Sequence, residues 1–369
     1  MSKWRESRLG DHIVINAKSV DKAYPHSEIS YLDTGSITRG RIESLQPFLL
    51  ADAPSRARRI VQENDVVVSM VRPIQRHYGF LRKVAPNMVA STGFVVLTCK
   101  ETIDPYFLYS YLSQDDVVDY LDMVAEGSTS AYPAFTPDVI ENLVINLPPI
   151  VEQRAIATVL SSLDDKIDLL HRQNKTLETL GLSYWRNTFI ETAEESWRKK
   201  KLAEFFQVKT GKKDANYSTP DGLYPFFTCS QEVLQSPTYS FEGHALLLAG
   251  NGDFNLKRYK GKFEAYQRTY VLIPNDEALV GFLYFGMQHH LDDITMGHRG
   301  SVINFITKGM IENFEMPIMP SAQEFQQICE SLNEFNVKVD SNISQISQLV
   351  CMREALLSKL MSGEVFVSQ

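Results

Sequence analysis

The alternation of apolar and polar residues divides the chain into two halves with the same order of predicted elements. Each half begins with short β-type runs, which Gly, Pro and Asn residues separate. The clearest runs are 65–71, 93–97, 245–249 and 269–273. A short helical segment follows in each half, at 105–113 and at 280–289. A proline then precedes a long amphipathic helix, Pro149 in the first half and Pro320 in the second.

Both long helices carry apolar residues at alternating steps of four and three, a heptad pattern typical of a coiled coil. The first seam is Ile156, Leu160, Leu163, Ile167, Leu170, Asn174 and Leu177. The second is Ile328, Leu332, Phe335, Val339, Asn342, Ile346, Leu349, Arg353, Leu356 and Leu360. One asparagine in each seam can fix the register of pairing at some cost in stability. Two ordinary core helices are the alternative, but the matching seams favour mutual pairing.

The sequence also repeats itself at the level of single residues. Trp4-Arg5 returns as Trp197-Arg198, and Ile140-Glu-Asn-Leu returns as Ile311-Glu-Asn-Phe. The offset is 193 at the start and 172 in the long helices, where Ile156 returns as Ile328, so the first copy is 21 residues longer. The ends of the copies agree while their middles differ. A common frame with two different recognition surfaces is the organisation we infer.

Net charge is −8 over 369 residues, but the basic residues are concentrated locally. Residues 1–100 hold 15 Lys and Arg against 9 Asp and Glu, and residues 198–275 hold 12 against 7. Residues 101–147 hold 9 acidic residues and no Lys or Arg. Local clustering determines the field that a phosphate backbone experiences, so two basic segments keep a nucleic-acid partner open despite the acidic total.

Composition indicates an ordinary globular protein. We expect no membrane-spanning segment and no signal peptide, because apolar runs are short and the first residues are polar, and we expect a cytoplasmic location. The four cysteines show no zinc-type or redox spacing and are interpreted as reduced, mostly buried residues: Cys99, Cys229, Cys329 and Cys351.

Motifs of catalysis are missing from the sequence. It contains no phosphate-binding Gly-x-x-x-x-Gly-Lys-Ser/Thr loop, no Asn/Asp-Pro-Pro-Tyr/Phe motif of adenine methyltransferases, no His-Glu-x-x-His and no nucleophile elbow. Pro137-Asp138 and Pro220-Asp221 lack the downstream Glu-x-Lys of a nuclease core. We expect a non-catalytic protein without metal or cofactor.

Candidate DNA contacts are basic and amide side chains interleaved with aromatic residues, since phosphates take Arg, Lys and hydroxyls and base edges take bidentate Arg, Asn or Gln. In the first half these are Arg56, Arg58, Arg59, Arg72, Arg76, His77 and Tyr78, and Arg72 is expected at a strand end. In the second half they are Asn251, Asn255, Lys257, Arg258, Tyr259, Lys260, Lys262, Gln267 and Arg268. A solvated surface charge is the alternative for each residue taken singly.

Three further features have open interpretations. Gly127-Ser128 and Gly297-His-Arg299 lie at equivalent repeat positions, as phosphate-binding turns or as plain tight turns. The basic run 198–201 is interpreted as a solvated linker rather than a phosphate contact. The carboxylates of Asp164, Asp165 and Asp168 are expected to be solvated or to face a partner, not to bind metal.

Several long motifs resemble the specificity subunits of type I restriction–modification enzymes. Leu147-Pro-Pro-Ile-Val-Glu-Gln-Arg-Ala-Ile-Ala, continuing through Leu163-Asp-Asp-Lys-Ile-Asp-Leu-Leu, is similar to the central repeat of that family. Asp52-Ala-Pro-Ser-Arg-Ala-Arg-Arg, Ser91-Thr-Gly-Phe and Glu126-Gly-Ser-Thr-Ser resemble one class of target-recognition domain, and Gly261-Lys-Phe-Glu-Ala-Tyr resembles another. The second helix departs from the pattern, because Pro320-Ser-Ala-Gln-Glu-Phe lacks the Glu-Gln-Arg of the first.

The resemblance implies an α+β fold of two globular target-recognition domains in pseudo-twofold repeat, separated by two long helices that pair as an antiparallel coiled coil. The expected boundaries are 1–150 and 191–320 for the domains, and 151–190 and 321–364 for the spacer helices. It further implies that each domain recognises half of a bipartite double-stranded DNA site. Adenine-methyltransferase subunits and a motor–nuclease subunit would be the partners. A coiled-coil scaffold with protein-binding heads is the alternative, and it has no need of basic clusters in both heads.

Overall fold

The computed structural model describes residues 4–128, 132–296 and 305–367 and divides the chain into two compact units. The first unit comprises Met1–Asp168 and Ser347–Gln369, and the second comprises Leu169–Ile346. Two long helices, α4 (Ile150–Arg186) and α8 (Ala322–Met361), contribute residues to both units. Within the described residues, no helix has the length and apolar character that crossing a membrane requires.

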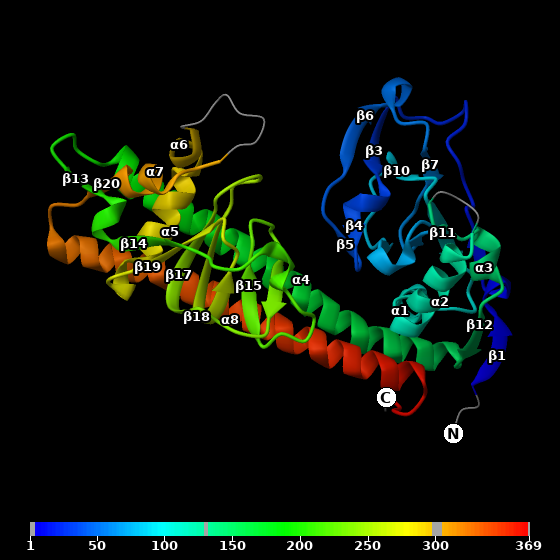
Figure 1. Cartoon of the computed structure of the whole chain (residues 1–369). Helices are drawn as coiled ribbons and strands as arrows, with labels where there is room; N and C mark the ends of the chain where they lie inside the picture. The colour runs from blue at the N-terminus through cyan, green and yellow to red at the C-terminus, as the bar shows by residue number, and fades with distance from the viewer. Residues whose placement is uncertain (1–3, 129–131, 297–304, 368–369) are drawn as a thin grey trace. The chain divides into compact units, whose positions relative to one another are not determined.

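The first unit is built on a four-stranded sheet of order β2-β11-β8-β9. A second sheet has the order β6-β3-β10-β7, and its four strands are labelled in Figure 1. The strands are β1 (Arg5–Arg8), β2 (Ile13–Ile15), β3 (Glu28–Leu32), β4 (Ile37–Thr38), β5 (Arg41–Ile42), β6 (Gln46–Leu49), β7 (Ala57–Ile60), β8 (Val66–Ser69), β9 (Tyr78–Phe80), β10 (Met88–Ser91), β11 (Phe94–Cys99) and β12 (Val144–Leu147). The short helices are α1 (Pro105–Leu112), α2 (Asp115–Glu126) and α3 (Pro137–Glu141).

The second unit repeats this plan with a six-stranded sheet of order β14-β19-β17-β18-β15-β16. Its strands are β13 (Arg198–Lys201), β14 (Phe206–Thr210), β15 (Tyr224–Phe227), β16 (Val233–Ser236), β17 (Phe241–Ala249), β18 (Leu256–Ala265), β19 (Thr269–Pro274) and β20 (Glu315–Ile318). Its short helices are α5 (Val280–His289), α6 (Leu291–Thr295) and α7 (Lys308–Asn313).

Register shows that the central strands of the two sheets are equivalent. In the first unit Leu97 of β11 pairs with Ile15 of β2 and with Val66 of β8. In the second unit Leu272 of β19 pairs with Val208 of β14 and with Leu246 of β17. Ile15 and Val208 differ by 193, the offset of the sequence repeat. The predicted repeat, the β-type runs that form β8, β11, β17 and β19, and the α+β class are confirmed.

One apolar core in each unit joins sheet, short helices and both long helices. Buried Phe107 of α1 packs in one cluster with Ile156 and Leu160 of α4 and Leu360 of α8. In the second unit Trp185 of α4 and Phe189, just after that helix, pack in one cluster with Phe282 of α5, Leu246 of β17 and Leu332 of α8. Each long helix therefore contributes buried residues to the cores of both units, and this accounts for its length.

Polar pairs determine the antiparallel register of α4 and α8. In the second unit the side-chain amide of Asn342 donates to Oδ1 of Asn174 over 2.8 Å. In the first unit Nε of Arg353 donates to Oδ1 of Asp164 over 2.7 Å. From Asp164 to Asn174 the residue number in α4 rises, while that of the partner in α8 falls from Arg353 to Asn342, so the two helices run antiparallel. Every residue of both predicted seams is buried or half-buried, so the antiparallel coiled coil is confirmed.

Two sequence-based expectations differ from the structure. The run 198–201, expected as a solvated linker, is strand β13, which pairs antiparallel with β20. A strand needs only a partner for its backbone, and here its basic side chains lie largely exposed. Asp164, expected to be solvated or partner-facing, is half-buried, because it accepts from Arg353 and from the Tyr106 hydroxyl of α1.

Candidate nucleic-acid interface

Exposed basic residues of the first unit meet at one end of its central sheet, where β8 ends and β11 begins. Ser69 pairs with Phe94 there, and the Met70 amide donates to the Gly93 carbonyl over 2.9 Å. The Thr92 amide donates to the carbonyl of Arg56 over 2.8 Å, which brings the loop before β7 to the same place. Arg56 and Arg72, both exposed, therefore reach this sheet end from different segments.

The corresponding end of the second unit's sheet also gathers predicted candidates. Ala249, the last residue of β17, pairs with Thr269, the first of β19. The amide of Gly250 donates to the carbonyl of Arg268 over 2.8 Å, and the amide of Gln267 donates to the carbonyl of Lys213 over 2.9 Å. Gln267 and Arg268 are exposed and Asn251 is half-buried beside them. The two halves of the chain thus place Arg and amide side chains at equivalent sheet ends.

The strands of each sheet hold the loops that carry these side chains. Cationic and amide groups from loops can contact phosphates and base edges, while the strands behind them hold their backbones in place. Arg58 and Ser128, two further candidates of the first unit, are exposed and half-buried respectively. The Nε of Arg58 donates to the carbonyl of Ser55 over 3.3 Å, and its neighbour Arg59 is half-buried.

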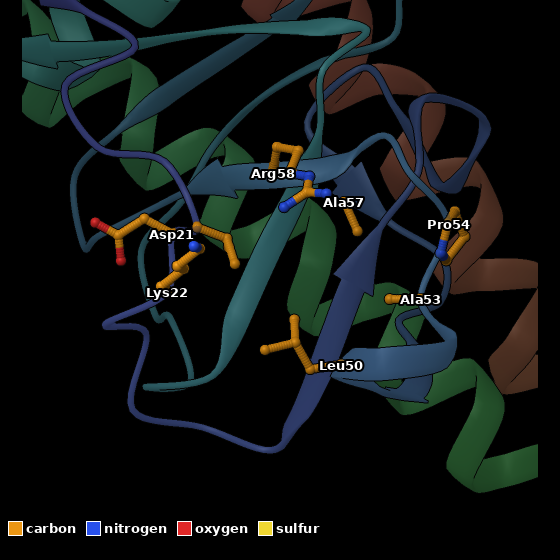
Figure 2. Close-up of a pocket in the computed structure, with 8 residues that line it drawn as sticks. Asp21, Lys22, Leu50, Ala53, Pro54, Ala57 and Arg58 are labelled. Atoms are coloured by element: carbon orange, nitrogen blue, oxygen red, sulfur yellow. The ribbon is translucent and has the colours of Figure 1, made fainter.

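Arg58 also borders a shallow cavity of about 340 Å³ in the first unit (Figure 2). Figure 2 shows Arg58 at one side of it and Asp21 and Lys22 at another. Leu50, Ala53, Pro54 and Ala57 form its apolar part. One acidic and two basic residues around an apolar floor make no defined binding set.

Other predicted contacts are engaged inside their own unit. Tyr78 is only 7% exposed and packs in the core of the first unit. The Arg76 side chain, 17% exposed, forms a 2.8 Å ion pair with Asp115 of α2. Asn255 is buried and donates to the carbonyls of Cys229 and Asp253. The ammonium of Lys257 donates to the carbonyl of Ser230 over 2.5 Å, and burial lowers its pKa.

Arg258 is enclosed by other parts of its own unit. The Arg258 side chain is 7% exposed. Its guanidinium makes two hydrogen bonds to the carboxylate of Asp340 in α8, at 2.6 and 2.7 Å, and lies over the ring of Tyr284. Burial raises the pKa of Tyr284 to about 12. Lys260, two residues along β18, forms an ion pair with Glu277. Arg258 thus attaches the sheet to the coiled coil of its own unit and does not lie on an open surface.

Three basic residues with defined contacts were not among the predicted ones, and two of them, Lys213 and Arg39, lie near the sheet ends described above. Lys213, whose ammonium lies 4.2 Å from the ring centroid of Tyr217, joins Gln267 through the backbone contact described above. Arg39 belongs to the turn between β4 and β5, and its amide donates to the carbonyl of Arg76 over 2.8 Å. Arg82 forms a 2.6 Å ion pair with Asp165 of α4. Arg299, a predicted contact, lies outside the described residues.

Groups of three or more His, Cys, Asp or Glu residues arranged to hold a metal are not found among residues 4–128, 132–296 and 305–367. All four cysteines are free thiols. Burial raises the pKa of Cys99 and of Cys329 to about 12 in each case. Cys351 is exposed, which differs from the expectation of mostly buried cysteines.

The type I restriction modification DNA specificity domain model matches the chain twice, at residues 1–179 and 194–350. These matches cover most of the sequence, and the chain belongs to this family. The type I restriction enzyme EcoDI specificity subunit of Escherichia coli is 41% identical over 175 residues, which are 46% of this chain and 38% of the relative. The MjaIX specificity subunit of Methanocaldococcus jannaschii is 24% identical over 359 residues, 84% of this chain and 80% of the relative.

Among solved structures, the type I restriction–modification S subunit from M. genitalium has a TM-score of 0.62 at 18% identity, covering 100% of this chain and 97% of that one. The likeness shows the fold. The chain matches less than half the length of the EcoDI relative and of the HindI specificity subunit of Haemophilus influenzae, which is 29% identical over 193 residues, 52% of this chain and 42% of that relative.

Proposed function

We propose that this chain is the DNA-recognition subunit of a type I restriction–modification complex. Each unit recognises one half of a bipartite double-stranded site through the basic end of its central sheet. Adenine methylation and DNA cleavage are performed by partner subunits, namely adenine-methyltransferase subunits and a motor–nuclease subunit. The chain itself has no catalytic role and works in the cytoplasm, where the DNA it recognises lies.

One observation carries this proposal: equivalent sheet ends in the two repeats present Arg and amide groups. Arg56 and Arg72 lie at this position in the first unit, and Gln267 and Arg268 lie there in the second. A protein-binding adaptor would not need the same chemistry at both positions. Different side chains at equivalent places suit two half-sites of different sequence, because base edges are read by individual side chains.

In this proposal, the coiled coil sets the number of base pairs between the two half-sites. Helix α4 has 37 residues and is about 55 Å long at 1.5 Å per residue. One turn of DNA, at 10–10.5 base pairs, occupies about 34–36 Å. A helix pair of this length, held in register by Asn174–Asn342 and Asp164–Arg353, would keep the unread middle of the site at a constant number of base pairs.

The test is a genome-wide map of methylated adenine in cells that express the cognate methyltransferase subunits with and without this chain. A bipartite motif with a constant spacer should be methylated only when the chain is present. Methylation that is unchanged by removal of the chain would contradict the proposal. Salt-sensitive retention of the chain on duplex DNA, with a logarithmic slope of several units, separates it from a protein-binding adaptor.

A further inference from the structure

Three arginines of the first unit have left-handed backbones and lie together. Among the described residues other than glycine, positive φ occurs at Asn16, Asn64, Arg39 (47°), Arg72 (47°) and Arg76 (58°). Asparagine adopts this region readily, but for a residue such as arginine it costs about 1–2 kcal/mol. The Arg39 amide donates to the Arg76 carbonyl, so the turn of β4 and β5 rests on the turn that Arg72 and Arg76 enclose. Strain of this kind persists where the surroundings impose it, and it gathers at functional sites.

Three hydrogen bonds from backbone amides and one ion pair hold the turn between Arg72 and Arg76 in place. The Arg72 amide donates to the Pro133 carbonyl over 3.0 Å, and the Arg76 amide closes the turn on the Pro73 carbonyl over 2.8 Å. The Ile74 amide donates to the carboxylate of Asp122 in α2 over 3.1 Å. The Arg76 guanidinium is held by Asp115 of the same helix over 2.8 Å. Helix α2 therefore anchors the turn at two points.

This rigid turn presents an aliphatic side chain to solvent. Ile74 is 52% exposed at its tip, between Arg72 and Gln75, which are also exposed. The turn follows β8 directly and so belongs to the sheet end that holds Arg56. The isoleucine therefore stands on a rigid turn, beside exposed Arg72 and Gln75, at the sheet end that the proposed function assigns to DNA contact.

We propose that Ile74 is a specificity-determining residue of the first unit, which contacts the 5-methyl group of a thymine in the major groove. The inference rests on the proposed function. The thymine methyl is the apolar feature of the base edges in that groove, and Arg and Gln are the side chains that read neighbouring guanine and adenine. Arg76 is a positioning residue: it holds the turn through Asp115 and leaves base contact to Arg72, Ile74 and Gln75. A turn fixed in advance loses little conformational entropy when it binds.

The experiment uses the chain with its cognate methyltransferase subunits and the duplex site that the wild type methylates. Each thymine of the first half-site is replaced in turn by deoxyuridine, which removes only the methyl group. Binding of the wild type should weaken about fourfold at one thymine, the fold-change expected for loss of one buried methyl. The I74A variant should bind the thymine and uracil duplexes equally well. V144A, which shortens a similarly exposed β-branched residue on β12, should discriminate as the wild type does.

Arg76 supplies a second variant for the same measurement. R76A retains Ile74 but loses the ion pair, so its preference for thymine over uracil should fall. R76K retains a cation for Asp115 and should restore part of it. A merely structural Arg76 would change overall binding and leave the ratio of thymine to uracil binding intact.

Each outcome is decisive. If the wild-type complex shows no preference for a bipartite site, the proposed function fails. If it has such a preference but no thymine of the first half-site discriminates, or the half-site contains only G·C pairs, the assignment of Ile74 is overturned. The assignment is also overturned if I74A keeps the full discrimination of the wild type.

Discussion

The carboxylate of Asp340 receives two hydrogen bonds from the guanidinium of Arg258, at 2.6 and 2.7 Å, which join strand β18 to helix α8. In the first unit Arg82, which follows β9, pairs with Asp165 of α4 over 2.6 Å. Strands β9 and β18 are equivalent, because β9 pairs with β8 and β18 pairs with β17, and β8 and β17 occupy corresponding places in the two sheets. In both units an arginine on this strand or just after it thus attaches the sheet to a long helix. A unit whose recognition surface must keep its orientation on the helix pair gains from such an attachment.

The Arg258–Asp340 pair stabilises the second unit and should leave DNA contact alone. Because Arg258 is buried, we expect R258M to lower the free energy of unfolding of this unit by about 2 kcal/mol. A double-mutant cycle with D340N, followed by hydrogen exchange in β18 and α8, measures the coupling. R268A, a control at an exposed arginine of the same unit, should stay within about 0.5 kcal/mol of wild type. Equal effects of R258M and R268A would refute this assignment.

The asparagine pair of the coiled coil should be costly to break on one side only. Asn342 is fully buried, so N174L leaves its amide without an acceptor and should destabilise the helix pair by about 1–3 kcal/mol. Because two apolar residues of similar size can pack in the seam, the N174L/N342L double variant should recover much of that loss. Chemical unfolding of the three proteins checks this. A double variant with losses equal to the sum of the single ones would show that the two asparagines act independently.

Acidification should weaken the second unit through two histidines. Burial lowers the pKa of His244, and the nearby Arg258 and Lys260 lower it further against the opposing effect of Glu277. Burial, His290 and Arg186 lower the pKa of His289. Because the fold favours the neutral rings, the unfolded chain binds protons at a higher pH than the folded chain does. The contribution of the two histidines to the free energy of unfolding is therefore fully present above about pH 6.5 and declines below it. The unfolding temperature should fall between pH 7.5 and 5.5, and less so in H244Q/H289Q. The same fall in both proteins would contradict the assignment.

Arg56 and Arg58 test the phosphate contacts of the first unit. Both are exposed, and their replacement by Ala should weaken DNA binding with little change in sequence preference. The slope of log binding constant against log salt should decrease by about 0.9 for each lost contact. An R5A/R8A variant, also basic and outside the sheet end, serves as the control. If the slope of R56A/R58A equals that of wild type, these arginines are not in the interface.

Much of the fold was predictable because its signals are periodic. The seams from Ile156 and from Ile328 repeat over many residues, and the apolar segment at 280–289 coincides with α5. The sheet β6-β3-β10-β7 had no such signal: its strands are four or five residues long, and β3 and β10 pair in parallel although they lie far apart in the chain. Short runs with distant partners are decided by tertiary contacts rather than by local pattern.

The candidate site was predictable by residue type but not by position. Arg258 and Arg268 lie ten residues apart in one basic segment, yet the first is enclosed by α8 and Tyr284 and the second is exposed. Arg258 lies within β18, where it reaches α8, whereas Arg268 lies in the turn between β18 and β19, and only the folded chain shows this difference. Ile74 had no signal at all, because an isoleucine after a strand is usually a core residue and its exposure follows from the left-handed Arg72 and Arg76.

The most direct test of two independent readers is to map adenine methylation with R72A and with R268A, each expressed with the cognate methyltransferase subunits. R72A should relax base choice in one half of the methylated motif and R268A in the other, each by about 1–3 kcal/mol where the arginine contacts a base in bidentate fashion. The spacer and the opposite half should stay as in the wild type. If either variant changes both halves together, or both variants change the same half, the account of one half-site for each unit is wrong.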